Sequence, residues 1–443
     1  MTKKIGVRRE DLYPWERRTP LVPTDARELQ EKHGIDVIVQ SSAKRVFTEA
    51  QYREAGVEVR DSLSDCPIIL GIKEIPLAAV EREKTYVFFS HTIKGQPHNM
   101  PMLQRLLELG CTLIDHEKVT DDNGRRLVFF GQFAGLAGMI DTLWALGVRL
   151  RWEGIPSPFE DVKRALDYPD LAAARRALAG VAARIKDEGL PQAITPLVVG
   201  FAGYGNVSRG AQEILDLLPV EETSPHELAT LTQRKGRRDR VVYKVVFKEE
   251  DLVEPIEQGK GFDLQEYYHH PDRYRGVFER FLPYLDVLVN GVYWEPIYPR
   301  LVTKKWLKDN ANQGRPRLRV IGDISCDIEG AIESTIKATE PDNPVYVYDP
   351  VENRAIDGVA GNGPVTLAVD ILPTELPREA STYFSGVVKP FIPSLVQANL
   401  RGPFQDSRLP PPLERAVIVY RGELTPSYRY LEQFLSERAT SHA

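Results

Sequence analysis

The sequence predicts an α/β protein with two doubly wound, mainly parallel sheets, each forming a domain. In both halves of the 443 residues, short apolar runs alternate with amphipathic stretches, which is typical of βα repeats and parallel sheets. A glycine-rich turn at Gly203 and Gly205 lies between an apolar run and an amphipathic one, and nearly half of the chain precedes it. We therefore expect the second domain to bind a nucleotide and the first to carry another part of the function.

The composition excludes several classes of protein. Hydrophobic residues make up 42% of the chain, charged residues 27%, and the net charge is −6, so no electrostatic surface for nucleic acid is expected. No apolar run reaches the ~20 residues of a membrane span, and the basic N-terminus lacks the apolar core of a signal peptide. We expect a cytoplasmic protein with no membrane partner. The three cysteines, Cys66, Cys111 and Cys326, are widely spaced, which indicates free thiols and no metal site.

The first half contains four short apolar runs bounded by polar residues. An amphipathic helix is expected at 101–109, and a longer one from about 130 to 150. The small residues of Gly131-Gln-Phe-Ala-Gly-Leu-Ala-Gly138 would permit close packing at a domain junction, so we place the first domain at residues 1–135. Strands are expected at 35–39, 67–72, 86–89 and 111–114.

The second half repeats the pattern. Residues 221–240 are polar and strongly basic, which is typical of a solvated loop. From about 370 the chain is rich in proline, and we expect this segment to pack irregularly back over the first domain. The prediction is an inserted domain at 136–369, with 370–443 completing the first domain and the two facing each other across a cleft. Strands are expected at 196–202, 241–246, 287–290 and 318–323.

The glycine-rich turn has the features of a dinucleotide-binding, Rossmann-like motif. Gly203 permits a tight turn, Gly205 lets the backbone approach a pyrophosphate, and the following helix offers its N-terminal amides to that anion. Ser208 stands where a third glycine is usual, and Gly210 follows two positions later. The strand before and the helix after favour nucleotide binding over a plain tight loop. The candidate cofactor-binding residues are Gly203, Tyr204, Gly205, Asn206, Val207, Asn290 and Gly291.

Polar residues follow the expected strands of the first half, at the sheet edge where ligands bind in such folds. Taken singly, a histidine at a strand end is more often a hydrogen-bonded structural group, and a lysine or glutamate there is more often plain surface. Their placement at successive strand ends favours an active site. These residues are Lys73 and Glu74 after one strand, His91 and Lys94 after the next, and Glu117 after the third.

Longer motifs extend from one end of the chain to the other. They are Trp15-Glu-Arg-Arg-Thr-Pro20, Leu70-Gly-Ile-Lys73, Phe88-Phe-Ser-His-Thr-Ile-Lys94, Gly131-Gln-Phe-Ala-Gly-Leu-Ala-Gly-Met-Ile140 and Asn290-Gly-Val-Tyr-Trp-Glu295. In these motifs the chain resembles the lysine–2-oxoglutarate reductase part of the aminoadipic semialdehyde synthase family, and more distantly the lysine-forming saccharopine dehydrogenases and the alanine dehydrogenases. The saccharopine-cleaving half of the fused enzymes is expected to be absent, so a separate dehydrogenase would cleave saccharopine.

The resemblance implies an oxidoreductase that reversibly condenses L-lysine with 2-oxoglutarate and reduces the imine to saccharopine with a nicotinamide cofactor. It assigns proton transfer to Lys73 and His91, a role that suits a histidine and a lysine among other cations. Helix capping is the competing interpretation of Asp327. The implied substrate contacts are Arg18, Lys94 and Arg126 for the carboxylates, Glu74 and Glu117 for the amino groups, and Asp327 near the nicotinamide.

The choice of cofactor rests on two opposed signals. Glu221 lies 18 positions after Gly203, near the spacing at which an acidic residue that binds the ribose 2′-hydroxyl of NAD is expected. The fused reductases that the chain resembles generally use NADPH, and a basic run could reach a 2′-phosphate. We expect NADPH/NADP+, with NADH/NAD+ as the alternative. The basic run contains Arg234, Lys235, Arg237 and Arg238.

Two other functions compete with this assignment. The same fold could serve another amine or 2-oxo acid, as in an opine-type enzyme or an alanine dehydrogenase. Against a plain alanine dehydrogenase, the strand ends carry more charge than pyruvate and ammonia need. The second alternative is a non-catalytic NADP(H) sensor, which loss of Lys73 or His91 would have favoured; both are present. The sequence does not define the oligomeric state.

Overall fold

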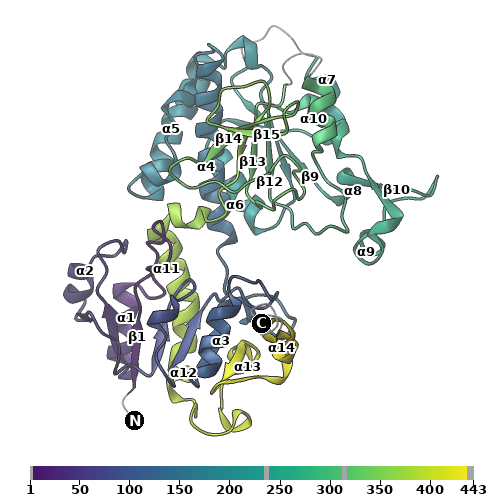
Figure 1. The fold of residues 1–443 in the computed structure, drawn as a ribbon. Helices are drawn as coiled ribbons and strands as arrows, with labels where there is room; N and C mark the ends of the chain where they lie inside the picture. Colours follow the sequence, from purple (N-terminus) through teal and green to yellow (C-terminus); the bar gives the residue numbers. More distant parts are fainter. Residues whose placement is uncertain (1–2, 234–238, 312–316, 437–443) are drawn as a thin grey trace. The chain divides into compact units, whose positions relative to one another are not determined.

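The computed structural model describes residues 3–233, 239–311 and 317–436. By its internal contacts the chain forms two compact units, coloured along the sequence in Figure 1. Unit 1 comprises Met1–Phe130 and Pro377–Ala443, and unit 2 comprises Gly131–Leu376. The corresponding boundaries expected from the sequence are 135/136 and 369/370.

Unit 1 contains an eight-stranded sheet in the order β18-β17-β6-β5-β4-β1-β2-β3. The six strands from β1 to β6 pair in parallel, and β17 pairs antiparallel with β6 and β18. The carboxyl ends of β4, β5 and β6 therefore lie at one edge of the sheet, side by side. The strands are β1 (Lys4–Val7), β2 (Asp36–Gln40), β3 (Glu58–Arg60), β4 (Ile68–Leu70), β5 (Thr85–Phe88), β6 (Thr112–Asp115), β17 (Val417–Tyr420) and β18 (Glu423–Leu424).

The C-terminal segment is more regular than the sequence analysis expected. Its prolines stand in the first turn of α12 and α13, where a missing N–H costs no intrahelical hydrogen bond and the fixed φ suits a helix. The segment also adds β17 and β18 to the sheet. The helices of unit 1 are α1 (Pro23–His33), α2 (Glu49–Glu54), α3 (Met100–Glu108), α11 (Pro377–Val388), α12 (Ile392–Gln397), α13 (Pro411–Arg415) and α14 (Glu432–Ser436).

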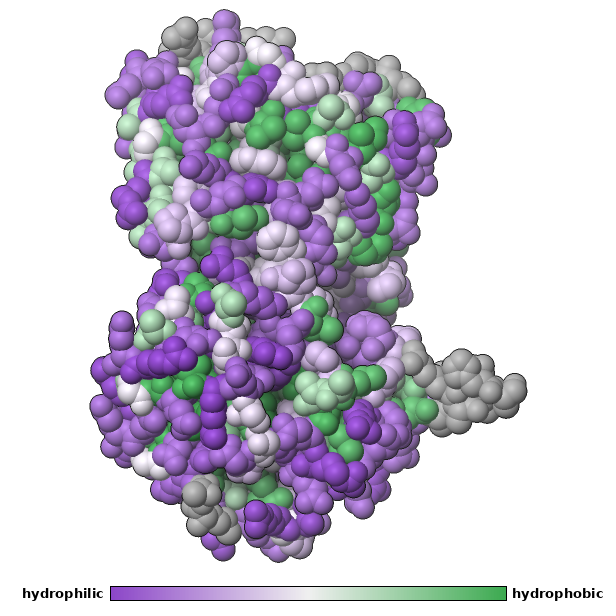
Figure 2. All heavy atoms as spheres, turned by 60° about the vertical axis from the view of Figure 1, so that its left-hand side comes forward, coloured by the Kyte–Doolittle hydropathy of each residue, from purple (hydrophilic) through white to green (hydrophobic). Residues whose placement is uncertain are grey.

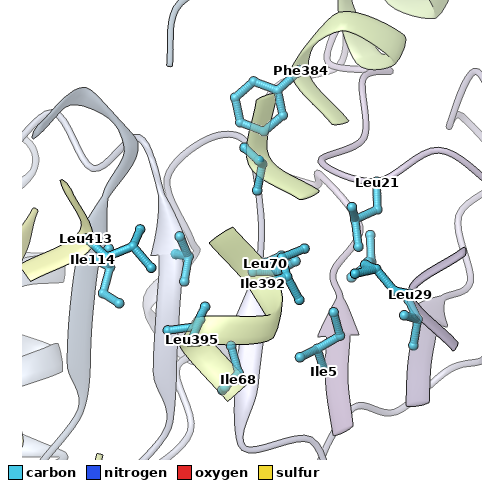
Figure 3. Packing of buried hydrophobic residues seen from close by; sticks show 14 of the residues in the cluster. Ile5, Leu21, Leu29, Ile68, Leu70, Ile114, Phe384, Ile392, Leu395 and Leu413 are labelled. Carbon is cyan, nitrogen blue, oxygen red and sulfur yellow. The ribbon is translucent and has the colours of Figure 1, made fainter. Parts of the chain in front are cut away.

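One hydrophobic cluster joins the early strands of unit 1 to its late helices. Figure 3 shows side chains from β1, β4 and β6 meeting those from α1 and α11 to α13. Segments more than 300 residues apart in the sequence, such as Ile5 and Phe384, thus share one core in which both are fully buried. This burial fixes the sheet from which the candidate site extends.

Unit 2 contains a second eight-stranded sheet, in the order β15-β14-β16-β13-β12-β7-β9-β8. The strands from β7 to β13 in this sheet, together with β16, pair in parallel, whereas β14 is antiparallel to both of its neighbours. The strands are β7 (Val198–Ala202), β8 (Val220–Glu222), β9 (Val242–Phe247), β12 (Val287–Asn290), β13 (Val320–Asp323), β14 (Val345–Asp349), β15 (Arg354–Asp357) and β16 (Val365–Leu367), with β10 (Val253–Pro255) and β11 (Tyr274–Gly276) forming a separate pair.

The helices of unit 2 cover this sheet and extend from it. In Figure 1, α8 follows β9, and β10 and α9 project from that side of the unit. The helices are α4 (Gly131–Trp152), α5 (Leu171–Glu188), α6 (Asn206–Leu215), α7 (Leu228–Leu231), α8 (Glu249–Leu252), α9 (Leu264–His269) and α10 (Lys304–Ala311).

Glycines allow α4 to lie directly against α6. A Cβ atom on Gly135 would come within 1.9 Å of the Val207 carbonyl oxygen, and one on Gly210 within 2.2 Å of the Gln132 carbonyl oxygen. Neither distance is compatible with a side chain, so only glycine permits this approach. Gly210 thus provides close packing of the helix that follows the glycine turn, while Ser208 is buried.

One helix of the described residues is long and apolar enough to cross a membrane by length and composition, namely α4. This is weak support for a membrane span, because 83% of its most apolar window is buried inside the unit, and the core helix of a water-exposed protein passes the same test. The face drawn in Figure 2 is mostly hydrophilic, with hydrophobic side chains gathered in small groups.

Candidate functional site

Two neighbouring strands of unit 1 bring Lys73, Glu74 and His91 together. In the parallel pair β4–β5, Leu70 lies opposite Val87. The ladder continues past the strands, since the Phe89 amide donates to the Ile72 carbonyl oxygen at 2.9 Å. The chain therefore leaves both strands at the same level, and the residues that follow them lie at one edge of the sheet.

His91 and Glu74 form a short hydrogen bond across this edge. His91 Nδ1 lies 2.5 Å from Glu74 Oε1, with the Glu74 side chain 5% exposed and the His91 side chain 34% exposed. The His91 ring stacks on Phe89, with a 6.3 Å centroid separation. Asn99 Nδ2 donates to the His91 carbonyl oxygen at 3.1 Å, which holds a backbone with φ of +48°. The imidazole is thus fixed at Nδ1, and Nε2 is the nitrogen that can exchange a proton with a ligand.

The pKa of Glu74 depends on its burial and on two basic neighbours, His91 and Lys73. Burial alone would raise the pKa of this carboxyl, but the hydrogen bond and charge of His91, together with the charge of Lys73, lower it below its ordinary value. The other oxygen, Oε2, is buried and accepts no hydrogen bond from the described residues. A buried carboxylate oxygen without a donor is costly, so this atom is a ready acceptor for a donor group of a ligand.

Lys73 is held by a carboxylate that the sequence analysis did not single out. Glu10 accepts hydrogen bonds from the amides of Ile72 and Lys73, at 2.8 and 3.1 Å. The Lys73 ammonium lies 5.6 Å from the centroid of the Tyr13 ring, within range of a cation–π contact. The residue is half-buried, so the loop after β1 positions it at the sheet edge.

The third strand end supplies a second ion pair and a structural histidine. Arg126 lies 3.4 Å from Glu117, with side chains 46% and 21% exposed. His116 is buried, and its Nε2 lies 3.2 Å from the Gly71 carbonyl oxygen. Burial lowers the pKa of His116 to about 4, so this ring is neutral at physiological pH and serves the packing of the edge. Asp115 accepts from the Ser90 amide at 3.1 Å, which joins the ends of β5 and β6.

Arg18 is already paired inside unit 1. Its Nε and Nη2 donate to the two oxygens of Glu16 at 2.8 and 2.5 Å, and both side chains are buried. The guanidinium lies over the ring of Phe130, 4.2 Å from its centroid. A substrate carboxylate would have to use the remaining N–H groups of Arg18 or displace Glu16. Lys94 is exposed in the turn after β5, where its amide donates to Gln96 at 3.2 Å.

In unit 2 the glycine turn has the geometry that the sequence predicts. Gly203 follows β7 with φ of +89°, and Gly205 is the N-cap of α6. The Gly291 amide donates to the Ala202 carbonyl oxygen at 3.1 Å, which brings the end of β12 beside the turn. A Cβ atom on Gly205 would meet nothing within 4 Å, so the backbone there is open to a ligand. Asn206 is exposed and Val207 half-buried at the start of α6.

A pocket of about 480 Å³ begins at this turn. It extends to the residues after β9 and β12 and to the projecting helix α9. Its lining is rich in aromatic side chains, which can stack on a planar ring. They include Tyr204, Phe247, Tyr267, Tyr268, Trp294 and Tyr298.

Asn290 and Asp323 have a structural role at the ends of β12 and β13. Asn290 Nδ2 donates to Asp323 at 2.8 Å, and Thr335 Oγ1 donates to the other carboxylate oxygen at 2.5 Å. Burial raises the pKa of Asp323 to about 6. Asp327 is exposed in the following turn, and its carbonyl oxygen accepts from the Gly330 amide at 2.9 Å.

The sheet order separates Glu221 from the glycine turn. Glu221 is exposed on β8, which is the edge strand, and β9 lies between β8 and β7. Two strand spacings correspond to about 9.5 Å. The carboxylate that follows the strand beside β7 is Glu249, which residue counting from Gly203 did not identify. The basic run at 234–238 lies outside the described residues.

No group of three or more His, Cys, Asp or Glu side chains that could hold a metal ion is found among the described residues. Cys66 and Cys111 are buried free thiols, and Cys326 is a partly buried free thiol. Its Sγ donates to the Ala368 carbonyl oxygen at 2.9 Å.

Several known proteins are similar to this chain in sequence or in fold. Residues 6–137 match the family described as alanine dehydrogenase/PNT, N-terminal domain. An alpha-aminoadipic semialdehyde synthase of Arabidopsis thaliana is 42% identical over 442 residues, covering 96% of this chain and 41% of that protein. A saccharopine dehydrogenase (NAD(+), L-lysine-forming) of Emericella nidulans is 27% identical over 421 residues, covering 90% of this chain and 93% of that protein. The structure of an L-alanine dehydrogenase matches with a TM-score of 0.62 at 18% identity, covering 98% of this chain and 100% of that chain.

The structural match confirms the predicted α/β fold class with two Rossmann-like sheets. The chain spans 41% of the length of the Arabidopsis relative. The resemblance expected from the motifs is confirmed, because the aligned region covers nearly the whole chain. The chain is thus a relative of the alpha-aminoadipic semialdehyde synthases and, at lower identity, of the saccharopine dehydrogenases.

Proposed function

We propose that this chain condenses L-lysine with 2-oxoglutarate and reduces the resulting imine to saccharopine, in a reversible reaction. The observation that carries the proposal is the hydrogen-bonded pair of His91 and Glu74 next to Lys73, at the carboxyl ends of adjacent strands. The pair combines a fixed imidazole with a buried carboxylate oxygen that lacks a donor. It is supported by the similarity of the chain to alpha-aminoadipic semialdehyde synthases and saccharopine dehydrogenases.

The first stage of the reaction needs proton transfer at two places. The ε-amine of lysine must be neutral to attack the keto carbon, and the hydroxyl of the carbinolamine must gain a proton to leave as water. Glu74 holds His91 by Nδ1, so Nε2 would take or return the proton. Lys73 would supply the second proton donor at the same sheet edge. Acid–base groups of this kind typically contribute about 10²- to 10⁴-fold in rate.

The charged residues around this pair would select the substrates. Glu74 Oε2 is the buried acceptor that an amino group of lysine would satisfy. Glu117 would accept a second amino group, and Arg126 would bind a carboxylate of 2-oxoglutarate. Arg18 would add a second carboxylate contact through its N–H groups not used by Glu16, and the exposed Lys94 adds positive charge.

A bound reduced nicotinamide would supply the hydride that converts the imine carbon to the saccharopine carbon. The residues of unit 2 fit such a dinucleotide, because Gly205 is open to a ligand and the amides at the start of α6 suit a pyrophosphate. Gly203, Tyr204, Asn206 and Val207 would line the turn, and Gly291 would approach it from the end of β12. The match to alanine dehydrogenases supports a nicotinamide cofactor.

The test is an initial-rate assay of reduced nicotinamide consumption with 2-oxoglutarate as the common substrate. NADH and NADPH are offered in parallel, and lysine, ornithine, alanine or ammonia serves as the amine. We expect oxidation that saturates with lysine and yields saccharopine by mass. Turnover with another amine only would keep the fold and chemistry but replace the substrate. No turnover with any amine would favour a non-catalytic nucleotide sensor.

A further inference from the structure

We propose that Tyr430 and Phe434 position the turn that carries His91 and Lys94, and thereby set the affinity of the site for 2-oxoglutarate. Both residues lie in the last described segment of unit 1, a 3₁₀ helix (Pro426–Leu431) followed by α14. The inference rests on the proposed function, because it adds two positioning residues to the site described there.

The turn between β5 and α3 has little support from its own residues. The Gly95 amide donates to the Thr92 carbonyl oxygen at 2.9 Å, and the φ of Gly95 is +67°. His91 has a φ of +48°, a conformation that a residue with a side chain keeps when surrounding contacts hold it. The Lys94 side chain is exposed and forms no ion pair with the described residues, so the backbone on either side of it decides where its ammonium can reach.

Tyr430 holds the residue that precedes Lys94. Its phenol donates to the Ile93 carbonyl oxygen at 2.6 Å, across 337 positions of the chain. Partial burial raises the pKa of Tyr430, so the phenol stays protonated and remains a donor. The residue is 46% exposed and adds little to the core. Its hydrogen bond to the turn is therefore the more specific role of this side chain.

Phe434 covers the other side of the turn. A Cβ atom on Gly95 would lie 2.5 Å from the Phe434 ring, so the ring lies directly on the glycine backbone. Tyr430 and Phe434 are four positions apart, which places two side chains on one face of a helix. Tyr428 and Leu431 of the same segment are buried in the core of unit 1. In Figure 1, α14 lies beside α3, the helix that follows the turn.

The two contacts fix the backbone before and after Lys94, which the sequence resemblance assigns to a substrate carboxylate. His91 has further support, because Glu74 holds its ring and Asn99 holds its carbonyl oxygen. Loss of the Tyr430 hydrogen bond should therefore disturb Lys94 more than His91. Substrate binding should weaken while proton transfer is retained, which raises KM and leaves kcat nearly unchanged.

The test compares Tyr430→Phe with Tyr428→Phe. Each variant removes one phenol hydroxyl from the same segment, but Tyr428 donates to the Arg415 carbonyl oxygen, at 2.8 Å, rather than to the turn. We expect Tyr430→Phe to raise the KM for 2-oxoglutarate by about three- to tenfold, the worth of one neutral hydrogen bond. Its kcat, and both constants of Tyr428→Phe, should stay within about twofold of the wild type. In a Lys94→Met background, Tyr430→Phe should raise KM no further, because residues that act together are not additive.

Amide hydrogen exchange of the whole chain without substrates gives a second readout, which does not depend on the reaction. Exchange in the peptide that covers residues 90–96 should become about three- to tenfold faster in Tyr430→Phe, and should not change in Tyr428→Phe. Equal changes in both variants, no change in either, or a full additive effect of Tyr430→Phe on Lys94→Met would overturn the inference.

Failure of the inference can be told apart from failure of the proposed function. Faster exchange in Tyr430→Phe alone, in a chain without lysine-dependent turnover, would refute the proposed function and support the positioning of the turn. Lysine-dependent turnover with the same KM and the same exchange in both variants would refute the positioning and leave the proposed function standing.

Discussion

The hydrogen-bonded pair of Glu74 and His91 should contribute measurably to stability, with a characteristic dependence on pH. Burial is the largest effect on the pKa of Glu74 and raises it; His91 and Lys73 together outweigh that effect. His91→Ala removes the hydrogen bond and the charge that do most to lower the pKa of Glu74. Glu74 then becomes a buried carboxylate whose pKa lies above its ordinary value, so at neutral pH the variant carries a poorly compensated charge.

The size of the effect follows from the geometry. A hydrogen bond to a charged group contributes about 1.5–3 kcal/mol. Because the His91 side chain is 34% exposed, water weakens the interaction, and we expect a coupling energy of about 1–2 kcal/mol. In the wild type the lowered pKa of Glu74 stabilises the fold above the ordinary carboxyl pKa. In His91→Ala the raised pKa acts in the opposite sense, so stability is lost as pH rises through the new value and regained as pH falls.

The assay is urea unfolding of the wild type, His91→Ala, Glu74→Gln and the double variant between pH 5 and pH 7.5. Unit 2 is identical in all four proteins, so its contribution to the free energy of unfolding cancels in the double-mutant cycle. The loss of unfolding free energy in His91→Ala, relative to the wild type, should become smaller toward pH 5, as Glu74 takes up a proton. The double variant should lack this pH dependence. A deficit that does not change with pH, or a coupling energy below about 0.5 kcal/mol, would refute the assigned pairing.

Three further outcomes are expected. Lys73→Met should lower turnover by about 10²- to 10⁴-fold without weakening dinucleotide fluorescence titrations; unchanged turnover would remove Lys73 from the chemistry. Gly210→Ala should cost about 1–3 kcal/mol in urea unfolding, because its Cβ would lie 2.2 Å from the Gln132 carbonyl oxygen, whereas Gly180→Ala in α5 meets nothing within 4 Å and should be neutral or stabilising. Asp323→Asn should flatten the pH dependence of stability: burial raises the Asp323 pKa to about 6, so the stability present below its ordinary pKa is lost as pH rises through 6. A thermal-shift series with the same slope as the wild type would contradict this last expectation.

Sequence patterns correctly predicted the strands and helices whose own residues carry a clear apolar run or turn motif. The run before Gly203 is a buried strand, β7, and the turn and α6 follow where the glycines require them. Four strands of unit 1 were not predicted, because two to four residues carry little periodicity: β1, β3, β17 and β18. The proline-rich segment was predicted to be irregular because proline breaks helices internally, yet in the first turn proline is compatible with α12 and α13.

Sheet order explains why counting residues from the glycine turn does not lead to the strand that pairs with β7. The spacing rule assumes that the strand after the first helix pairs with the first strand. Here that strand is β8, which pairs with β9, and β9 takes the place beside β7. Strand pairing depends on long-range contacts, so residue spacing in this chain leads to Glu221 and only the sheet leads to Glu249.

The sequence predicted both basic and acidic residues for the site, and the structure pairs three of the basic side chains each with a carboxylate. His91 is paired with Glu74, and Arg126 with Glu117. Arg18 is paired with Glu16 in the same way. Such pairs suit substrates that carry both signs. A substrate carboxylate can take over the basic side chain of a pair while a substrate ammonium takes over its carboxylate, so neither member of the pair is left without a partner.

This exchange of partners has a consequence for specificity. Lysine and 2-oxoglutarate together bring ammonium and carboxylate groups, whereas ammonia and pyruvate bring fewer of each. With the smaller pair, any site charge that opens to receive a substrate would lack a compensating group, at a cost of about 1–3 kcal/mol for each unsatisfied buried group. Discrimination by unpaired polar groups is stronger than discrimination by fit in an apolar pocket. If the proposed function is correct, the pairing would favour a zwitterionic amine and a dicarboxylate for a physical reason that is independent of the sequence resemblance.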